Sequence, residues 1–312
     1  MHSKKTLLSL VFSSISLITM AQAPKYSNEF LSIGVGGRPM GMSGAVVAGV
    51  DDATAAVWNP AGLTGIEGNL QIAAMHAELF AGISKFDYAT LATKIDSART
   101  LGFSIVRFGT DDIPNTLDLI DASGVIDYSK IKSFSIADYA FLFSYAKISK
   151  IAGLRFGGNA KIIHRKAGDF GKAWGFGFDL GAQYHSNGWE FGIMAKDVTS
   201  TYNAWSYNTD LLEETYSKTN NEIPKNTTEI TLPKLILGAG YKYEFSKKIT
   251  GRMELNADMT FDGRSSTIVQ PNMGVGLRLG KLTIDYALTN IGSQEILYSN
   301  VFSLKLDIYK HK

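Results

Sequence analysis

The sequence predicts an all-β protein, a transmembrane antiparallel β-barrel of about 12–14 strands, with a short N-terminal plug that contains a small helix. Three observations predict this fold. The chain begins with an export leader. Apolar and polar residues then alternate over about twelve segments of roughly 10 to 14 residues, a length typical of membrane-spanning strands. Short and long links alternate between these segments.

Residues 1–23 have the pattern of a secretory signal peptide. Lys4 and Lys5 precede the apolar run TLLSLVFSSISLITM, and Ala21-Gln22-Ala23 provides a small-x-small cleavage site. The apolar run is shorter than the roughly 20 residues that a membrane anchor needs. The chain has no cysteine, which excludes a lipoprotein anchor, disulfides and thiolate metal sites.

Residues 24–68 are predicted to form a plug in or under the barrel, because they are rich in glycine and alternate too briefly for a spanning strand. Within them, DDATAAVW predicts a short helix. Asp51 or Asp52 is expected to cap it by accepting the free N–H groups of its first turn. Asn59-Pro60 should end the helix, since the residue before proline avoids helical dihedrals. Gly62 then permits a turn, and Trp58 is expected to be a buried anchor.

Residues 69–312 are predicted to form the barrel. One face of each strand is apolar and suits lipid, as with Phe141, Phe143 and Tyr145. The other face carries charges and several glycines, which suits a lumen that holds a channel, a ligand or the plug. The alternative is a large exported β-sandwich, which should have shorter strands and one shared dry core. The predicted strands lie near 69–82, 84–95, 99–109, 135–148, 152–166, 173–186, 188–198, 232–246, 249–263, 270–280, 281–291 and 297–309.

The long links are 110–134, 199–231 and 263–270. In outer-membrane barrels the long loops are extracellular and the short turns are periplasmic. An even number of strands then places both termini in the periplasm. Aromatic and acidic residues make these loops candidate partner-binding surfaces. A solvated cover over the pore is the alternative. The candidate loop residues are Asp111, Asp112, Trp205, Tyr207 and Tyr216.

No catalytic, cofactor or metal site is expected. The histidines are scattered, and neither a G-x-S-x-G elbow nor a nucleotide-binding fingerprint in its strand-helix context is present. A net charge of +2 gives no concentrated basic face, so no nucleic-acid partner is expected.

The stretch from Phe30 to Leu63, FLSIGVGGRPMGMSGAVVAGVDDATAAVWNPAGL, resembles the N-terminal signature of the PorV/PorQ family of Bacteroidota outer-membrane proteins. That family is similar in turn to FadL-type fatty-acid transport barrels. Its barrels usually have fourteen strands, so two short strands are expected in residues 24–68 or in the loops. Ser43 stands where the family commonly has glycine. The signature positions include Gly34, Gly36, Arg38, Gly41, Gly44, Asp51, Asp52, Trp58, Asn59, Pro60 and Gly62.

The resemblance implies a non-enzymatic component of the type IX secretion system, which would bind the translocon and the C-terminal signal domain of secreted proteins. Its expected surroundings are outer-membrane lipid and other outer-membrane secretion proteins. The alternative is a FadL-like channel for hydrophobic small molecules, with which the plug and the glycine-lined lumen agree equally well. A purely structural barrel is a third possibility.

Overall fold

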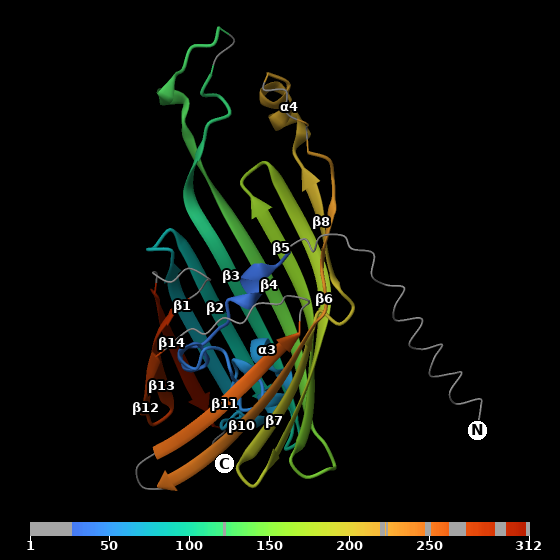
Figure 1. The fold of residues 1–312 in the computed structure, drawn as a ribbon, viewed down its shortest axis with the longest axis vertical. Helices are drawn as coiled ribbons and strands as arrows, with labels where there is room; N and C mark the ends of the chain where they lie inside the picture. The colour runs from blue at the N-terminus through green and yellow to red at the C-terminus, as the bar shows by residue number, and fades with distance from the viewer. Residues whose placement is uncertain are drawn as a thin grey trace, which may run out of the picture.

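The computed structural model describes residues 27–120, 123–218, 222, 224–246, 251–261, 273–290 and 298–309. Fourteen antiparallel strands form one sheet that curves into a barrel (Figure 1). This confirms the predicted fold class. The strands are β1 (Leu70–Leu79), β2 (Ser84–Lys94), β3 (Arg99–Asn115), β4 (Lys132–Ile148), β5 (Leu154–Ala167), β6 (Gly171–Ser186), β7 (Trp189–Lys196), β8 (Thr201–Tyr207), β9 (Thr228–Thr231), β10 (Lys234–Ser246), β11 (Gly251–Phe261), β12 (Met273–Leu279), β13 (Leu282–Asn290) and β14 (Tyr298–Ile308).

The sheet follows the chain as an up-and-down meander. Its main path is β11-β10-β7-β6-β5-β4-β3-β2-β1-β14-β13-β12. β1 pairs with β14 from Leu70 opposite Ile308 to Glu78 opposite Asn300, which joins the two ends of the strand series. β8 pairs with β6 and β9. β7 and β8 pair with different parts of β6, so β8 continues the wall position of β7 toward the long loops. β9 pairs with β8 and continues the wall position of β10 in the same direction.

Two sequence predictions about the loops are wrong. The segment 199–231 was predicted as a loop, but it contains β8, the helix α4 (Thr209–Lys218) and β9. These two strands agree with the expectation of two further short strands in residues 24–68 or in the loops, although alternation did not locate them. The link 110–134 is also shorter than predicted, since β3 reaches Asn115 and β4 begins at Lys132. The outer part of that hairpin carries the short helix η4 (Tyr128–Lys130).

Strand alternation separates two faces as the sequence predicts. On the outer face, Phe143, Phe176 and Leu180 are 51%, 51% and 57% exposed. On the inner face, Lys161 and Asp179 are buried. Tyr241, Tyr298 and Tyr309 are exposed at or near strand ends, where aromatic girdles occur. The predicted inward charges of β11 lie outside the side chains that the structure describes.

Residues 27–68 lie within the barrel, as the blue segment in Figure 1 shows. Four short helices make up their regular structure. No helix in the described part of the chain is long and apolar enough to span a membrane. The four helices are η2 (Glu29–Ser32), α2 (Gly37–Gly41), α3 (Ala55–Trp58) and η3 (Pro60–Gly65). We call residues 27–68 the plug.

Candidate functional site

The inner wall accommodates the plug where its strands have glycine. A Cβ atom at Gly157 of β5 would overlap the backbone of Pro60, and one at Gly181 of β6 would overlap the Asn59 side chain. Strand glycines of this kind mark close approach of another backbone. The inward glycines therefore provide a seat for the plug.

Asn59 attaches the plug to this seat. Its side-chain amide donates to the carbonyl oxygens of Val47 (2.9 Å), Ala182 (3.1 Å) and Ile193 (3.3 Å). The last two belong to β6 and β7. The Asn59 side-chain oxygen also accepts from the Ala61 N–H at 3.2 Å and caps η3. Asn59 is fully buried, so these bonds form in a low-dielectric setting where an unpaired amide would be costly.

Trp58 joins the two halves of the plug. Its indole N–H donates to the Val35 carbonyl at 2.8 Å. Its ring lies against Gly34 and Gly44, where a Cβ atom would stand 2.6 Å and 3.0 Å from ring carbons. The side chain contacts both buried apolar clusters of the molecule. Trp58 itself is only half-buried, which corrects the expectation of a buried anchor.

The predicted capping role of Asp51 and Asp52 is wrong. Helix α3 begins at Ala55 rather than near residue 51, and its N-cap residue, Thr54, has no side-chain capping bond. Asp52 instead accepts from the N–H of Thr54 at 2.9 Å and from its hydroxyl at 2.5 Å. The N–H of Thr54 has no acceptor within the helix, so the Asp52 carboxylate satisfies it just before α3 begins.

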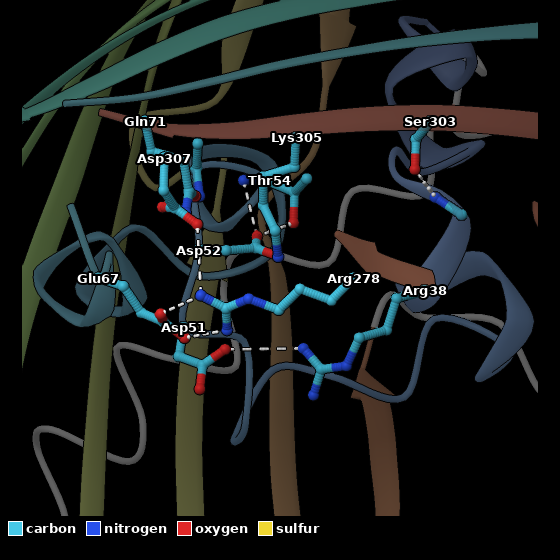
Figure 2. A network of polar contacts seen from close by, with 12 residues as sticks. Arg38, Asp51, Asp52, Thr54, Glu67, Gln71, Arg278, Ser303, Lys305 and Asp307 are labelled. Carbon is cyan, nitrogen blue, oxygen red and sulfur yellow. Dashed lines mark hydrogen bonds and ion pairs between the residues drawn. The ribbon is translucent and has the colours of Figure 1, made fainter. Parts of the chain in front are cut away.

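The two acids bind plug and barrel together (Figure 2). Asp52 forms an ion pair with Lys305 of β14 at 2.9 Å. Asp51 lies 3.6 Å from Arg38 of α2 and 3.6 Å from Lys242 of β10. Adjacent acids thus connect two opposite ends of the strand path through one segment of the plug.

A second set of polar contacts surrounds these acids. Gln71 of β1 accepts from the Ala53 N–H at 2.6 Å and donates to Asp307 of β14 at 2.6 Å. Arg278 of β12 holds Glu67, at the end of the plug, with bonds of 2.8 Å and 2.5 Å (Figure 2). A cavity of about 640 Å³ lies between these groups. We call this charged region the polar anchor.

Charge pairing lowers the pKa of two acids of the plug in the polar anchor, Asp52 and Glu67. Burial alone would raise the pKa of the Asp52 carboxyl, but Lys305, the Thr54 hydrogen bond and Arg38 together hold that pKa far below its usual range. The hydrogen bond from Arg278 lowers the pKa of Glu67. Both groups are therefore carboxylates at neutral pH, and their ion pairs are intact.

The half of the lumen nearer the long loops has a different character. There the plug side chains Phe30, Val35 and Met40 are buried in one cluster with inward residues of the wall, and Leu31 and Ile33 pack against them. The wall residues of this cluster form an apolar patch on the inner face, beside buried polar residues such as Ser104 and Lys161. We call the following wall residues the apolar seat: Leu79, Phe86, Val106, Leu142 and Ile163.

A break in the barrel wall separates β7 from β8. Asp197 and Ser200 in this break have φ angles of 54° and 57°, which non-glycine residues rarely adopt. Lys161 lies 2.7 Å from Asp179 and 2.6 Å from Asp197, and all three side chains are at most 10% exposed. Asp179 also accepts from the Asp197 N–H at 2.9 Å. The buried ion pairs therefore hold the irregular backbone in place.

Other signature residues form the plug's internal packing. Gly34, Gly36 and Gly44 have positive φ angles, and the Gly36 N–H contacts the Met75 sulfur at 2.9 Å. Gly41 packs against the backbone of Gly274 in β12. Gly62 is required by close approach to the Val50 carbonyl rather than by its own turn.

The candidate loop residues lie on three elements, β3, β8 and α4. Asp111 and Asp112 lie in the outer part of β3, where Asp111 is 3.4 Å from Lys85 and Asp112 sits at a β-bulge with a φ of 57°. Trp205 and Tyr207 stack on each other in β8, with ring centroids 5.7 Å apart. Tyr216 lies in α4. None of the described contacts joins the two aspartates with the aromatic residues.

In the described ranges, no three His, Cys, Asp or Glu side chains form a group that could hold a metal ion. The sequence predicts charged side chains on the inner face of the strands, but it does not identify Gln71, Asn159 or Asp197 as partners of Lys161, Asp179 and Asp307. Polar residues at alternating strand positions predict which side chains face the lumen, but they do not predict which of those side chains pair with each other.

Known proteins match this chain in structure and not in sequence. No protein-family model matches it, and no curated protein matches it. The CymD monoaromatic hydrocarbon channel is 13% identical with a TM-score of 0.50, and the match covers 90% of this chain and 99% of that one. The P. putida toluene transporter TodX is 9% identical with a TM-score of 0.54, covering 89% and 99%. A Pseudomonas aeruginosa FadL homologue is 11% identical with a TM-score of 0.41, covering 85% and 97%.

The CymD and TodX matches show that this chain shares the β-barrel fold of those two proteins.

Proposed function

We propose that this protein is a non-enzymatic outer-membrane channel for hydrophobic small molecules, with both termini in the periplasm and the long loops outside. Of the two functions that the sequence suggested, this was the alternative. It draws support from the FadL-like fold, since the matched CymD and TodX structures are a hydrocarbon channel and a toluene transporter.

The observation that carries the proposal is the apolar seat. A pore for ions or sugars needs a wet, polar interior, whereas Phe30 and Val35 of the plug pack in one buried cluster with an apolar patch of the lumen wall. An apolar molecule of similar size has the same contacts available when residues 29–36 move away. The plug side chains thus stand where a hydrophobic ligand would bind.

The attachment of the plug limits which part moves. Asn59 is bonded to two strands, and Asp52 is paired with Lys305. At the N-terminal end of the moving segment, the Asn28 amide donates to the Thr231 hydroxyl of β9 at 2.8 Å, and this hydrogen bond must break when the segment leaves the lumen wall. In the segment between Asn28 and the polar anchor, Phe30 and Val35 have apolar packing that an apolar ligand can replace. The same segment also has polar contacts that must break when it moves, because Lys234 of β10 lies 3.6 Å from Glu29 and donates to the Ser32 hydroxyl at 3.3 Å.

A reversible crosslink tests this mechanism. The chain has no cysteine, so Asn28→Cys with Thr231→Cys introduces one defined pair at positions whose side chains already touch. Intact cells of a host without such a channel would carry the variant, and uptake of labelled toluene and labelled oleate would be measured. Oxidation should abolish uptake and reduction should restore it. The two single-cysteine variants serve as controls.

Equal uptake in the oxidised and reduced states, with the crosslink verified on gels, would contradict a moving plug. Absence of uptake above the empty host for both compounds would contradict the channel itself.

The secretion role remains a prediction that rests on the PorV/PorQ-like signature. The signature residues lie inside the barrel and bond to its wall, so they do not themselves form an outside docking surface. Isolation of the tagged protein from outer membranes tests this role. Recovery of secretion machinery or of secreted C-terminal signal domains would favour it over the channel.

A further inference from the structure

A large groove opens on the membrane-facing surface of β4, β5 and β6. Its volume is about 1280 Å³, which is greater than the roughly 300–1,000 Å³ of most small-molecule pockets. Its floor is formed by Gly158 and Ala160 of β5, which are outward positions because Gly157 and Asn159 between and beside them point inward at the plug. Because the residues at these two successive outward positions are small, they leave the groove open along β5.

Bulky side chains form both sides of the groove. Phe143 and Tyr145 of β4 stand opposite Ala160 and Gly158 in the ladder. On the other side, Phe178 and Leu180 of β6 stand opposite the same two residues. All four side chains are between 37% and 57% exposed.

Aromatic neighbours hold these walls in place. The Phe143 ring lies 5.1 Å from Phe103, centroid to centroid, and the Phe178 ring lies 4.8 Å from Phe176 in an edge-to-face pair. Such pairs add stability beyond the area they bury. The groove is therefore preformed.

The chemistry of the groove changes at one end. Lys147, opposite Phe156 in the ladder, and Lys150, in the short turn between β4 and β5, are exposed and line the groove together with Ser149. Cationic side chains at the edge of an apolar, lipid-facing surface lie at the depth of the lipid headgroups. This end is on the side of the short turns, which the proposed orientation places in the periplasmic leaflet.

We propose that the groove is a binding site for one glycerophospholipid, with an acyl chain along Gly158 and Ala160 and its phosphate at Lys147 and Lys150. The apolar walls face the hydrocarbon region, so a chain is the occupant that meets them there. The small floor residues let it approach the backbone closely and gain dispersion contacts. The two lysines match the negative phosphate and fix the direction of the lipid.

The test uses the full-length protein purified from outer membranes in mild detergent. Palmitoyl-oleoyl-phosphatidylglycerol is added in known amounts, and retained lipid is counted by native mass spectrometry. Wild type should retain one tightly bound lipid. Ala160→Phe fills the groove and should weaken retention about tenfold. The matched control is Ala89→Phe, at an exposed position on β2, three strands away, which should not change it.

The charge arm replaces the lysines. Lys147→Gln with Lys150→Gln should weaken retention roughly 30-fold, since each cation near a lipid phosphate contributes about a fivefold effect. Lys130→Gln with Lys132→Gln, two exposed lysines at the opposite end of β4, is the control and should retain lipid like wild type. Heat-dependent gel mobility verifies that every variant is a folded barrel.

Equal retention by folded Ala160→Phe and Ala89→Phe would overturn the site. So would equal retention by the two lysine pairs, because it would leave the phosphate unplaced. The uptake assay is independent of this result: a lipid can bind here whether or not hydrophobic molecules pass through the lumen.

Discussion

Asp52→Asn isolates the ion pair between plug and barrel. The asparagine keeps an oxygen to accept from Thr54, but it loses the charge that faces Lys305 at 2.9 Å. The Asp52 side chain is 8% exposed and that of Lys305 is 19% exposed. Breaking a fully buried pair costs about 3–5 kcal/mol. Partial exposure of the lysine reduces this to about 2–4 kcal/mol, so local opening of the plug should increase roughly 30- to 700-fold.

The neighbouring acid provides the control. Asp51 is 29% exposed and lies 3.6 Å from Arg38 and from Lys242, whose side chains are also about a quarter exposed. Pairs of this kind contribute about 1 kcal/mol or less. Asp51→Asn should therefore raise plug opening by at most about fivefold.

Limited proteolysis of the folded barrel measures the opening, with heat-dependent gel mobility as the check that the barrel persists. Adding Lys305→Gln to Asp52→Asn removes the unpaired cation and should recover part of the loss, as a double-mutant cycle would show. If Asp52→Asn and Asp51→Asn opened the plug to the same extent, the ion pair would not be the main attachment.

The same pair sets a pH dependence. The pKa of Asp52 is depressed in the folded protein, so its stabilisation is complete above the ordinary carboxyl pKa of about 3.9 and is lost as the pH falls below it. Protease protection of the plug should therefore be unchanged between about pH 7 and pH 5 and should decline only in stronger acid.

Three further substitutions test the packing of the plug. Trp58→Ala should lower the free energy of plug opening by about 2–4 kcal/mol, which hydrogen exchange of the plug measures. This is less than the loss expected for a fully buried tryptophan, because the Trp58 ring is half-buried. Ser43→Gly should stabilise the plug by up to about 1 kcal/mol in the same measurement, because Ser43 has a φ of 56°. Gly157→Ala should expel the plug, because its Cβ would overlap Pro60, whereas the outward Gly158→Ala should keep it protected from protease. Equal protease sensitivity of the two glycine variants would show that close contact between the plug and the inward glycines does not hold the plug in the barrel.

Much of the barrel could be predicted because alternation is a local property. Lys161 and Asp179 point inward since each lies one residue from a lipid-facing neighbour. β8 escaped prediction for a physical reason. The backbone turns through positive φ angles at Asp197 and Ser200 just before it, and β8 has only seven residues. A strand so short, behind a break in the pattern, resembles a loop in the sequence.

The role of Asp52 could not be predicted from its neighbourhood. A local argument assigns its carboxylate to the nearest free N–H groups, which gives helix capping. The actual partner, Lys305, is 253 residues away. It reaches the plug only because β14 pairs with β1 in a register that sets Lys305 opposite Ala73. Pairing across the ends of the strand series determines this site, and no local pattern contains it.

The two kinds of plug attachment have different consequences for a ligand. An apolar molecule can replace the contacts of Phe30 and Val35 with the apolar seat at little net cost, because dispersion and hydrophobic contacts do not depend on which apolar group makes them. It offers nothing to Lys305 or to the carbonyl groups that Asn59 binds, and losing those partners would leave buried polar groups unpaired. Under the proposed channel function, a hydrophobic ligand is therefore expected to displace the apolar segment of the plug while the polar anchor stays closed.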